Sequence, residues 1–516
     1  MASLLDEYMN AAPALIECYS GAPGDLFTKA PATRPWDSNL VEGIRAYNDA
    51  LGHHPVFSGD EAVIITGQQP AIFAGPLYSV YKAITCIKLA EELSKKTNTP
   101  VVPVYWVGSE DHDFDEAATV YFPTRKHTTD KVTLECPPEH IGRSLHRIPV
   151  TEQVDALISD LLERGPGGEF RDDIEGFLRE SATASDSLAD WSTRILARLF
   201  RDTPLIFFAP HLAAARCASS SVIQAAIENP LTTSHAVNEG AQKMESLGYP
   251  AQVVKNEDEC GFFYEVDGVR NKVLYRDDTF HLPDLNTTIT KEELLETLEA
   301  DSERFSPNVA LRCVVQQHLF PVSAYVAGPG ELAYWGQFKG VFEAFDHPMP
   351  IVYPRAHAVL TSIKLNKLLS KYSLSPTDLL GQKDELLQSC LRTITDSPEI
   401  ERTQAANQET NTAIKTLADD LRANAPTAAN MATNLAEDLE RKFAKLENNL
   451  LLSDTKRRET VEGHLQRLQQ CLAPNRKPQE RMHTVVPYLF EQGWGLLDIL
   501  MQNLETGNTT LNEVEL

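Results

Sequence analysis

Five carboxylates and one imidazole fall within nine consecutive residues, GSEDHDFDE (108–116). Carboxylates packed at this density repel one another unless a metal ion or a substrate amine lies among them. The imidazole, His112, could then serve as a general base for an amine nucleophile or as a ligand. The alternative is a solvated acidic loop, which is the usual state of a run of charged residues.

A second segment that could take part in binding or catalysis is TGQQPAIFAGPLYSVYK (66–82), which contains two glycines and two glutamine amides. Its glycines permit a ligand to approach the backbone closely. Gln68 and Gln69 supply paired donors and acceptors, and Lys82 is a candidate point charge for a phosphate or carboxylate. The segment contains neither GK[ST] nor GxGxxG, so a tight turn with packed glutamines is the alternative interpretation.

A third segment, VAGPGELAYWGQ (326–337), combines a glycine-rich turn with aromatic residues. Glu331 opens a helix, where a carboxylate also stabilises the helix dipole without any further function. Tyr334 and Trp335 could line a pocket or, equally, pack into the core at helical spacing.

Three further polar residues are candidates for binding an anion. Arg355 follows Pro354 in VYPRAHAVL (352–360), and a fixed guanidinium there would suit a carboxylate or phosphate. A salt bridge to the acidic loop is the alternative. Asn308 and Arg312 open a helix and could add to the same site.

A local basic cluster occurs late in the chain, in CLAPNRKPQERMH (471–483). Arg476, Lys477 and Arg481 could hold a phosphate. The favoured interpretation is that they dock a helical arm onto the acidic core of the protein.

Short apolar runs precede most of these segments and predict buried parallel strands. The runs are AVIIT (62–66), VVPVYWV (101–107), PLIFFA (204–209), PVSAYVA (321–327) and PIVY (350–353). Residues 76–96 have helical spacing, so the first two runs form a strand–loop–helix–strand unit. This unit opens a doubly wound α/β domain, in which ligands bind at the carboxyl ends of the strands.

The remaining chain divides into insertions and a helical region. Residues of about 124–185 and 230–310 are expected to be insertions into a core spanning 1–385, the second with a hairpin at an Asp-Gly turn. From about 383 to 472 the only glycine is Gly463. Apolar residues there recur every three or four positions, which predicts a coiled-coil antiparallel hairpin within 386–516.

Composition excludes some functions. The chain has 516 residues, with 73 acidic and 47 basic side chains and a formal net charge of −26. This balance argues against binding of nucleic acid, whose phosphates require a basic surface. The eight cysteines show no CxxC spacing, so we expect free thiols and a cytoplasmic protein. No secretory signal and no apolar run long enough for a membrane span is recognised.

The motifs taken together resemble a known family. GQQPAIFAGPLYSVYKA, VPVYWVGSEDHDFDE, AGPGELAYW with PMPIVYPR, and LAPNRKPQER occur in this order, and they resemble the bacillithiol-biosynthesis cysteine-adding enzyme family. The chain departs from the family pattern at Ala71, usually Gly, and at Cys313, usually Pro. The resemblance implies a Rossmann-like core similar to class I aminoacyl-tRNA synthetases, with connecting-peptide insertions. It also implies a C-terminal α-helical coiled coil that mediates homodimerisation.

The resemblance further implies a reaction, the joining of cysteine to glucosaminyl-malate through an amide bond. ATP is the expected source of activation, and no metal is assigned. The alternatives are a class I-like nucleotidyltransferase acting on a different acid, and a nucleotide-binding coiled-coil scaffold.

Carried over by position, the resemblance implies site residues in this chain. Asp111, His112 and Asp113 are the expected catalytic residues, and Arg355 would hold the malate carboxylates. Arg476 and Arg481 form a possible second phosphate site. The expected substrate- or nucleotide-binding residues are Gly67, Gln68, Gln69, Tyr78, Lys82, Trp106, Glu110, Asp115, Asn308, Arg312, Gly328, Gly330, Glu331, Tyr334, Trp335 and Arg355.

Overall fold

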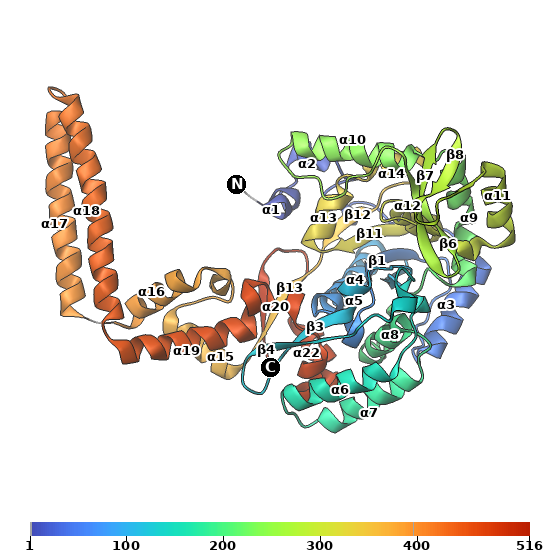
Figure 1. The fold of residues 1–516 in the computed structure, drawn as a ribbon, viewed down its shortest axis with the longest axis horizontal. Helices are drawn as coiled ribbons and strands as arrows, with labels where there is room; N and C mark the ends of the chain where they lie inside the picture. Colours follow the sequence, from blue (N-terminus) through green and yellow to red (C-terminus); the bar gives the residue numbers. More distant parts are fainter. Residues whose placement is uncertain (1–2, 396) are drawn as a thin grey trace. The chain divides into compact units, whose positions relative to one another are not determined.

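The computed structural model describes residues 3–395 and 397–516, so residues 1 and 2 of the predicted core and residue 396 of the predicted helical region lie outside it. Its contacts divide the chain into two compact units (Figure 1). The first contains the chain up to Arg125, Asp130–Ala358 and Glu480–Val514, and the second contains Lys126–Thr129, Val359–Gln479 and Glu515–Leu516. The sequence predicts a core that ends near residue 385. The division of the structure falls earlier, after Ala358, because Tyr372 and apolar residues between 386 and 391 share a cluster with Val461 and Leu465.

A five-stranded parallel sheet forms the centre of the first unit, as predicted from the apolar runs. Its order is β12-β11-β1-β2-β5. The strands are β1 (Ala62–Gln68), β2 (Val101–Val107), β5 (Ile206–Phe208), β11 (Val322–Ala327) and β12 (Ile351–Pro354). From β1 the chain adds β2 and β5 on one side and later adds β11 and β12 on the other. The topological switch point therefore lies at β1 and β11, where open α/β sheets bind their ligands.

Helices cover both faces of this sheet, because alternate strand residues point to opposite sides. Ile64 faces a cluster with Leu89 and Leu93 of α4 (Tyr78–Thr97), the helix that connects β1 to β2. Val63 and Ile65 face the larger core cluster. That cluster includes residues of α3 (Ser38–Ala50), α9 (Ala213–Glu228), α12 (Leu311–Leu319) and α13 (Pro329–Trp335).

Both predicted insertions are folded, and apart from Lys126–Thr129 they belong to the first unit. The earlier one contributes α6 (Glu152–Arg164) and α7 (Arg171–Thr183), between the sheet strand β2 and α8 (Leu188–Leu199). The later one contributes α10 (Thr232–Ser246), α11 (Lys291–Ala300) and an antiparallel sheet of order β10-β6-β7-β8-β9. Its strands are β6 (Glu259–Val266), β7 (Val269–Arg276), β8 (Thr279–Leu282), β9 (Thr287–Ile289) and β10 (Phe305–Pro307).

The hairpin predicted at an Asp-Gly turn is the β6–β7 pair. Val266 pairs with Val269, and the two turn residues, Asp267 and Gly268, have φ values of 52° and 79°. Positive φ at both central positions is the requirement of a type I′ turn, which Asp-Gly satisfies at little cost.

The second unit is helical. It contains α15 (Ile363–Tyr372), α16 (Lys383–Ile394), α17 (Pro398–Leu421), α18 (Pro426–Leu452) and α19 (Thr455–Leu472). Figure 1 shows α17 and α18 side by side as a long helical hairpin, as the heptad-like spacing predicts. Pro426 occupies the first turn of α18, where its missing N–H costs nothing. Within the described part of the chain, no helix combines the length and apolarity that crossing a bilayer requires.

Candidate active site

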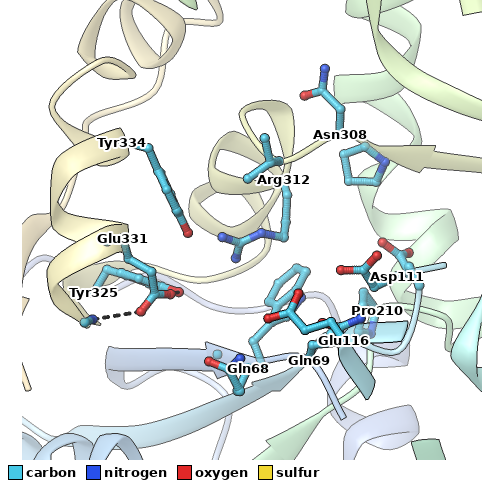
Figure 2. Close-up of a pocket in the computed structure, with 18 of the residues that line it drawn as sticks. Gln68, Gln69, Asp111, Glu116, Pro210, Asn308, Arg312, Tyr325, Glu331 and Tyr334 are labelled. Carbon is cyan, nitrogen blue, oxygen red and sulfur yellow. Dashed lines mark hydrogen bonds between the residues drawn. The ribbon is translucent and has the colours of Figure 1, made fainter. Parts of the chain in front are cut away.

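A cavity of about 660 Å³ opens at the switch point of the parallel sheet. Residues that follow β1, β2, β11 and β12 line it together with residues of the later insertion (Figure 2). It contains seventeen of the residues expected from the sequence. These are Gly67, Gln68, Gln69, Tyr78, Lys82, Trp106, Glu110, Asp111, His112, Asn308, Arg312, Gly328, Gly330, Glu331, Tyr334, Arg355 and Arg481. Segments from four strand ends are therefore brought to one place.

Lys82 is almost fully buried, and its ammonium group is surrounded by oxygen atoms of the protein. Its Nζ donates to the carbonyl oxygen of Gly67 at 2.6 Å and to Oε1 of Gln68 at 3.1 Å. It also forms an ion pair with Glu331 at 2.5 Å. Burial lowers the pKa of Lys82, and Glu331 opposes this effect. With three donors and three oxygens, the group has no donor left for the phosphate expected from the sequence.

Glu331 is the other half of this buried pair. Its Oε2 accepts from the backbone N–H of Gly328 at 2.8 Å, and its Oε1 accepts from the hydroxyl of Tyr325 at 2.6 Å. Burial alone would raise the pKa of Glu331, but Lys82 and these hydrogen bonds lower it overall. Glu331 therefore caps α13, as the sequence predicts, and also fixes the position of Lys82 beneath the cavity.

Arg355 is 2 % exposed and is paired with Glu480, a carboxylate of the segment 471–483. Its guanidinium makes two hydrogen bonds to Glu480, at 2.7 and 3.0 Å. Glu480 also accepts from the backbone of Ala358 at 3.0 Å and lies 2.9 Å from Nδ1 of His357. The salt-bridge alternative from the sequence is therefore present, with Glu480 in place of the acidic loop. The guanidinium edge that would hold malate is occupied by protein.

Arg312 forms no ion pair with a carboxylate of a described residue, unlike Lys82 and Arg355, although Arg270 and Arg481 at the cavity also lack one. Its guanidinium lies 6.0 Å from the ring of Trp106 and 5.8 Å from that of Tyr325. Its hydrogen bond to Oε1 of Gln316 is long, at 3.4 Å. Figure 2 shows Arg312 in the middle of the cavity, between Tyr334 and the acidic loop. This guanidinium is positioned to bind an anionic group of a ligand.

The five carboxylates of the acidic loop have separate environments, which explains how they coexist. Glu110 is buried and pairs with Arg216 at 2.8 Å. Asp113 accepts from the backbone of Glu116 at 3.2 Å and so caps α5 (Phe114–Ala118). Asp115 is exposed on that helix and, like Asp113, is not among the residues that line the cavity.

Two carboxylates, Asp111 and Glu116, therefore remain at the cavity beside His112. Nδ1 of His112 lies 3.4 Å from a guanidinium nitrogen of Arg270. Burial and Arg270 lower the pKa of His112, whereas Asp111 and Asp113 raise it. Within residues 3–395 and 397–516 no group of three or more His, Cys, Asp or Glu side chains is arranged to hold a metal ion.

Two other expected residues lie away from the cavity. Trp335 is fully buried and stacks on Tyr325 with ring centroids 4.5 Å apart, so its alternative interpretation as core is the one found. Arg476 donates to Gln382 at 2.6 Å within the second unit, whereas Arg481 lines the cavity.

Family comparisons agree with this architecture. The family model described as "Bacillithiol biosynthesis BshC, N-terminal Rossmann-like domain" matches residues 2–356. The model described as "Bacillithiol biosynthesis BshC, C-terminal coiled-coil domain" matches residues 358–515. The chain belongs to the BshC family. These matches confirm the expected family, the Rossmann-like fold and the coiled-coil region.

Curated BshC relatives cover most of the chain, and each is named "Putative cysteine ligase BshC". The protein of Desulforamulus reducens is 29 % identical over 90 % of this chain and 87 % of its own. The protein of Salinibacter ruber is 30 % identical over 88 % of this chain and 83 % of its own. The protein of Lysinibacillus sphaericus is 31 % identical over 91 % of this chain and 88 % of its own. A crystal structure titled as a putative arginyl-tRNA synthetase from Campylobacter jejuni aligns at 10 % identity with a TM-score of 0.24, which supports no argument.

Sequence reasoning missed the part of this BshC cavity that the later insertion supplies. The residues from this insertion are Gln252, Lys255, Phe263, Arg270, Pro307 and Val309. The expected site residues also omit five cavity residues of the core, Gly108 and Glu116 of the acidic loop together with Pro210, Tyr325 and Pro329. Most of them carry no motif of their own. Arg270 follows the Asp-Gly turn closely, but only the folded hairpin brings it to His112.

Proposed function

We propose that this BshC-family chain is a ligase that joins cysteine to glucosaminyl-malate through an amide bond, completing bacillithiol synthesis. The observation that carries the proposal is one cavity with two opposite kinds of free charge. The carboxylates of Asp111 and Glu116 suit an amine, and the guanidinium of Arg312 suits the carboxylates of the malate group. The amine and the malate carboxylates belong to the same substrate, so these charges would orient that substrate with its amine toward the activated carboxyl group of cysteine.

Activation of the cysteine carboxyl group is part of the proposal, because an amine and a carboxylate do not condense unaided in neutral water. ATP is the proposed donor. The backbone of Gly67 and the amides of Gln68 and Gln69 at the end of β1 are the groups that would contact it. Lys82 would act indirectly, by holding Gln68 and the Gly67 carbonyl in place.

The test is a reconstitution with the full chain. Purified protein, glucosaminyl-malate, cysteine and ATP are expected to give a thiol whose mass equals the two substrates less one water, measured by thiol labelling and mass spectrometry. Serine in place of cysteine is the matched control for substrate identity. Absence of product with every nucleoside triphosphate would contradict the proposal, and pyrophosphate exchange without cysteine would favour a nucleotidyltransferase on another acid.

We also propose that the chain forms a homodimer through the α17–α18 hairpin. Four large apolar side chains on this hairpin are exposed, namely Leu417 (51 %), Met431 (69 %), Leu435 (50 %) and Leu446 (48 %). Apolar residues at coiled-coil spacing that remain exposed in one chain are typically covered by a second.

Charge placed on this hairpin is expected to separate the dimer. A Met431→Asp, Leu435→Asp variant should be monomeric by light scattering, whereas Gln408→Asp, which adds one charge at an exposed polar position of α17, should leave the dimer intact. A dimer that persists in the double variant would place the interface elsewhere.

A further inference from the structure

The hydrogen bonding of His112 determines which of its ring nitrogens carries the proton. A guanidinium nitrogen of Arg270 lies 3.4 Å from Nδ1, and the nearest Asp111 oxygen lies farther away, at 4.0 Å. A guanidinium can only donate, so Nδ1 must accept. A neutral imidazole that accepts at Nδ1 carries its proton on Nε2. The structure therefore favours the Nε2–H form of His112.

Arg270 is held too firmly to move aside. It donates to the hydroxyl of Ser306 at 2.8 Å and to the carbonyl of Pro307 at 2.7 Å, and it stacks over Phe263 with its guanidinium 3.9 Å from the ring centre. Burial lowers the pKa of Arg270 to about 10, so the guanidinium stays charged at neutral pH.

Proton uptake by His112 is consequently disfavoured. Burial and Arg270 lower its pKa, Lys272 adds to the lowering, and Asp111 and Asp113 oppose it. Its one lone pair already faces Arg270, and Nε2 carries the proton. In this state His112 has an N–H to donate at Nε2 but no free lone pair at which to accept a proton.

Glu116 has the opposite properties. It lines the same cavity, and among the described residues its carboxylate has no hydrogen-bond or ion-pair partner. Figure 2 shows it beside Gln69 and near Asp111. Glu116 is exposed to the solvent of the cavity, yet partial desolvation raises its pKa, with contributions from Asp111 and Asp113, and Lys82 opposes the rise. A carboxylate with a raised pKa holds a proton more strongly and is the better base.

We propose that Glu116 is the general base of the reaction and that His112 is a hydrogen-bond donor beside it. The proposal rests on the proposed ligase function. One N–H bond of the substrate ammonium breaks, its proton passes to a carboxylate oxygen of Glu116, and the electron pair stays on nitrogen for attack. The neutral Glu116 then returns the proton to solvent through the open side of the cavity. No oxidation or reduction takes place.

Three variants and one control distinguish the roles of Glu116 and His112. Glu116→Gln is expected to lower kcat about 100-fold or more and to abolish the acidic limb of the kcat–pH profile, because the base must be ionised to act. His112→Gln, which retains a donor near the Nε2 position, should keep that limb and lose less kcat than His112→Ala. Glu296→Gln, on the exposed face of α11, is the control that should match the wild-type protein.

Two kinetic outcomes would overturn the assignment. In the first, the kcat of His112→Gln falls as far as that of His112→Ala, and the acidic limb of the kcat–pH profile is lost in His112→Gln but retained in Glu116→Gln. The other is Glu116→Gln raising KM with kcat and its pH profile unchanged, which would mark Glu116 as a binding residue only.

A spectroscopic measurement keeps the test independent of the ligase function. With ¹⁵N-labelled histidine, and the His112 signals assigned by comparison with His112→Gln, the shifts of the full chain should show Nε2–H and unprotonated Nδ1. An Nδ1–H signal would overturn the proposal even if the protein formed no amide. Failure of the wild-type protein to form product together with the expected tautomer would instead count against the ligase function.

Discussion

Replacing Arg312 by alanine is expected to raise the KM for glucosaminyl-malate about 100-fold, which corresponds to ~3 kcal/mol, and to change kcat much less. Arg312 is a cavity guanidinium that has no ion pair with a carboxylate of a described residue, so an anionic ligand would not have to displace a carboxylate from it. Loss of a contact made equally in the ground and transition states appears in KM. Steady-state kinetics with varied glucosaminyl-malate provide the measurement.

The chemistry of the substituent makes the Arg312 test specific. Arg312→Lys keeps the charge but loses the planar pair of donors, so we expect an intermediate KM. Arg304→Ala, which removes a guanidinium that stacks on Tyr264 and lies outside the cavity, is the control for a lost positive charge. An unchanged KM in Arg312→Ala would mean that another guanidinium lining the cavity, that of Arg270 or Arg481, binds the anion.

Replacing Glu480 by glutamine is expected to lower the free energy of unfolding of the first unit by about 3–5 kcal/mol. The variant leaves the guanidinium of Arg355 buried without its counter-charge, since Arg355 and Glu480 are 2 % and 3 % exposed. Removing both charges together avoids this cost. The double variant Arg355→Met, Glu480→Leu should therefore have a free energy of unfolding much closer to that of the wild-type protein.

The same pair predicts how stability depends on pH. The neighbouring Arg355 and His357 overcome the effect of burial and lower the pKa of Glu480 from an ordinary value near 4.5 to about 2. A carboxyl whose pKa is lower in the folded state stabilises the fold above its unfolded pKa. We therefore expect this stabilisation to be complete above about pH 5 and to be lost as the pH falls toward 2. Glu480→Gln should lack that acid-dependent component.

Tryptophan fluorescence in urea suits this measurement, because all five tryptophans lie in the first unit. Glu92→Gln is the matched control, since Glu92 pairs with Lys96 at 2.6 Å on an exposed helix face. Exposed pairs of this kind contribute at most about 1 kcal/mol. An equal shift of the urea midpoint in Glu92→Gln and Glu480→Gln would contradict the stabilising role of the Arg355–Glu480 pair.

Local patterns predicted the strands and the position of the site. Each strand is a short run of apolar, largely β-branched residues, and such runs are stable only when both faces are covered. Because the polar segments follow the carboxyl ends of these strands, the sequence alone indicates which edge of the sheet would carry the ligand. Gln68, Asp111 and His112 lie at that edge as expected.

The roles of the charged residues were much less predictable. Sequence reasoning treated Lys82 as a free cation and left Arg355 either free or paired with the acidic loop, yet each is held by a carboxylate from a distant part of the chain, Glu331 and Glu480. Nothing in the residues around a cation states which carboxylate will meet it. Ion pairing inside a protein depends on separations of a few ångströms, and those separations follow from the packing of whole elements.

The sequence by itself therefore determined the parallel sheet, the helical hairpin and the family. The spacing of apolar residues, the apolar runs and the order of the motifs can all be read along the chain without knowledge of its tertiary contacts. Only the tertiary structure decided which charges at the cavity remain available. It neutralises Lys82, Arg355 and Glu110 and leaves Arg312 and Glu116 without oppositely charged partners among the described residues. The physical reason is that burial makes an unpaired charge costly, so the fold pairs the buried charges and leaves free those that face the solvent of the cavity.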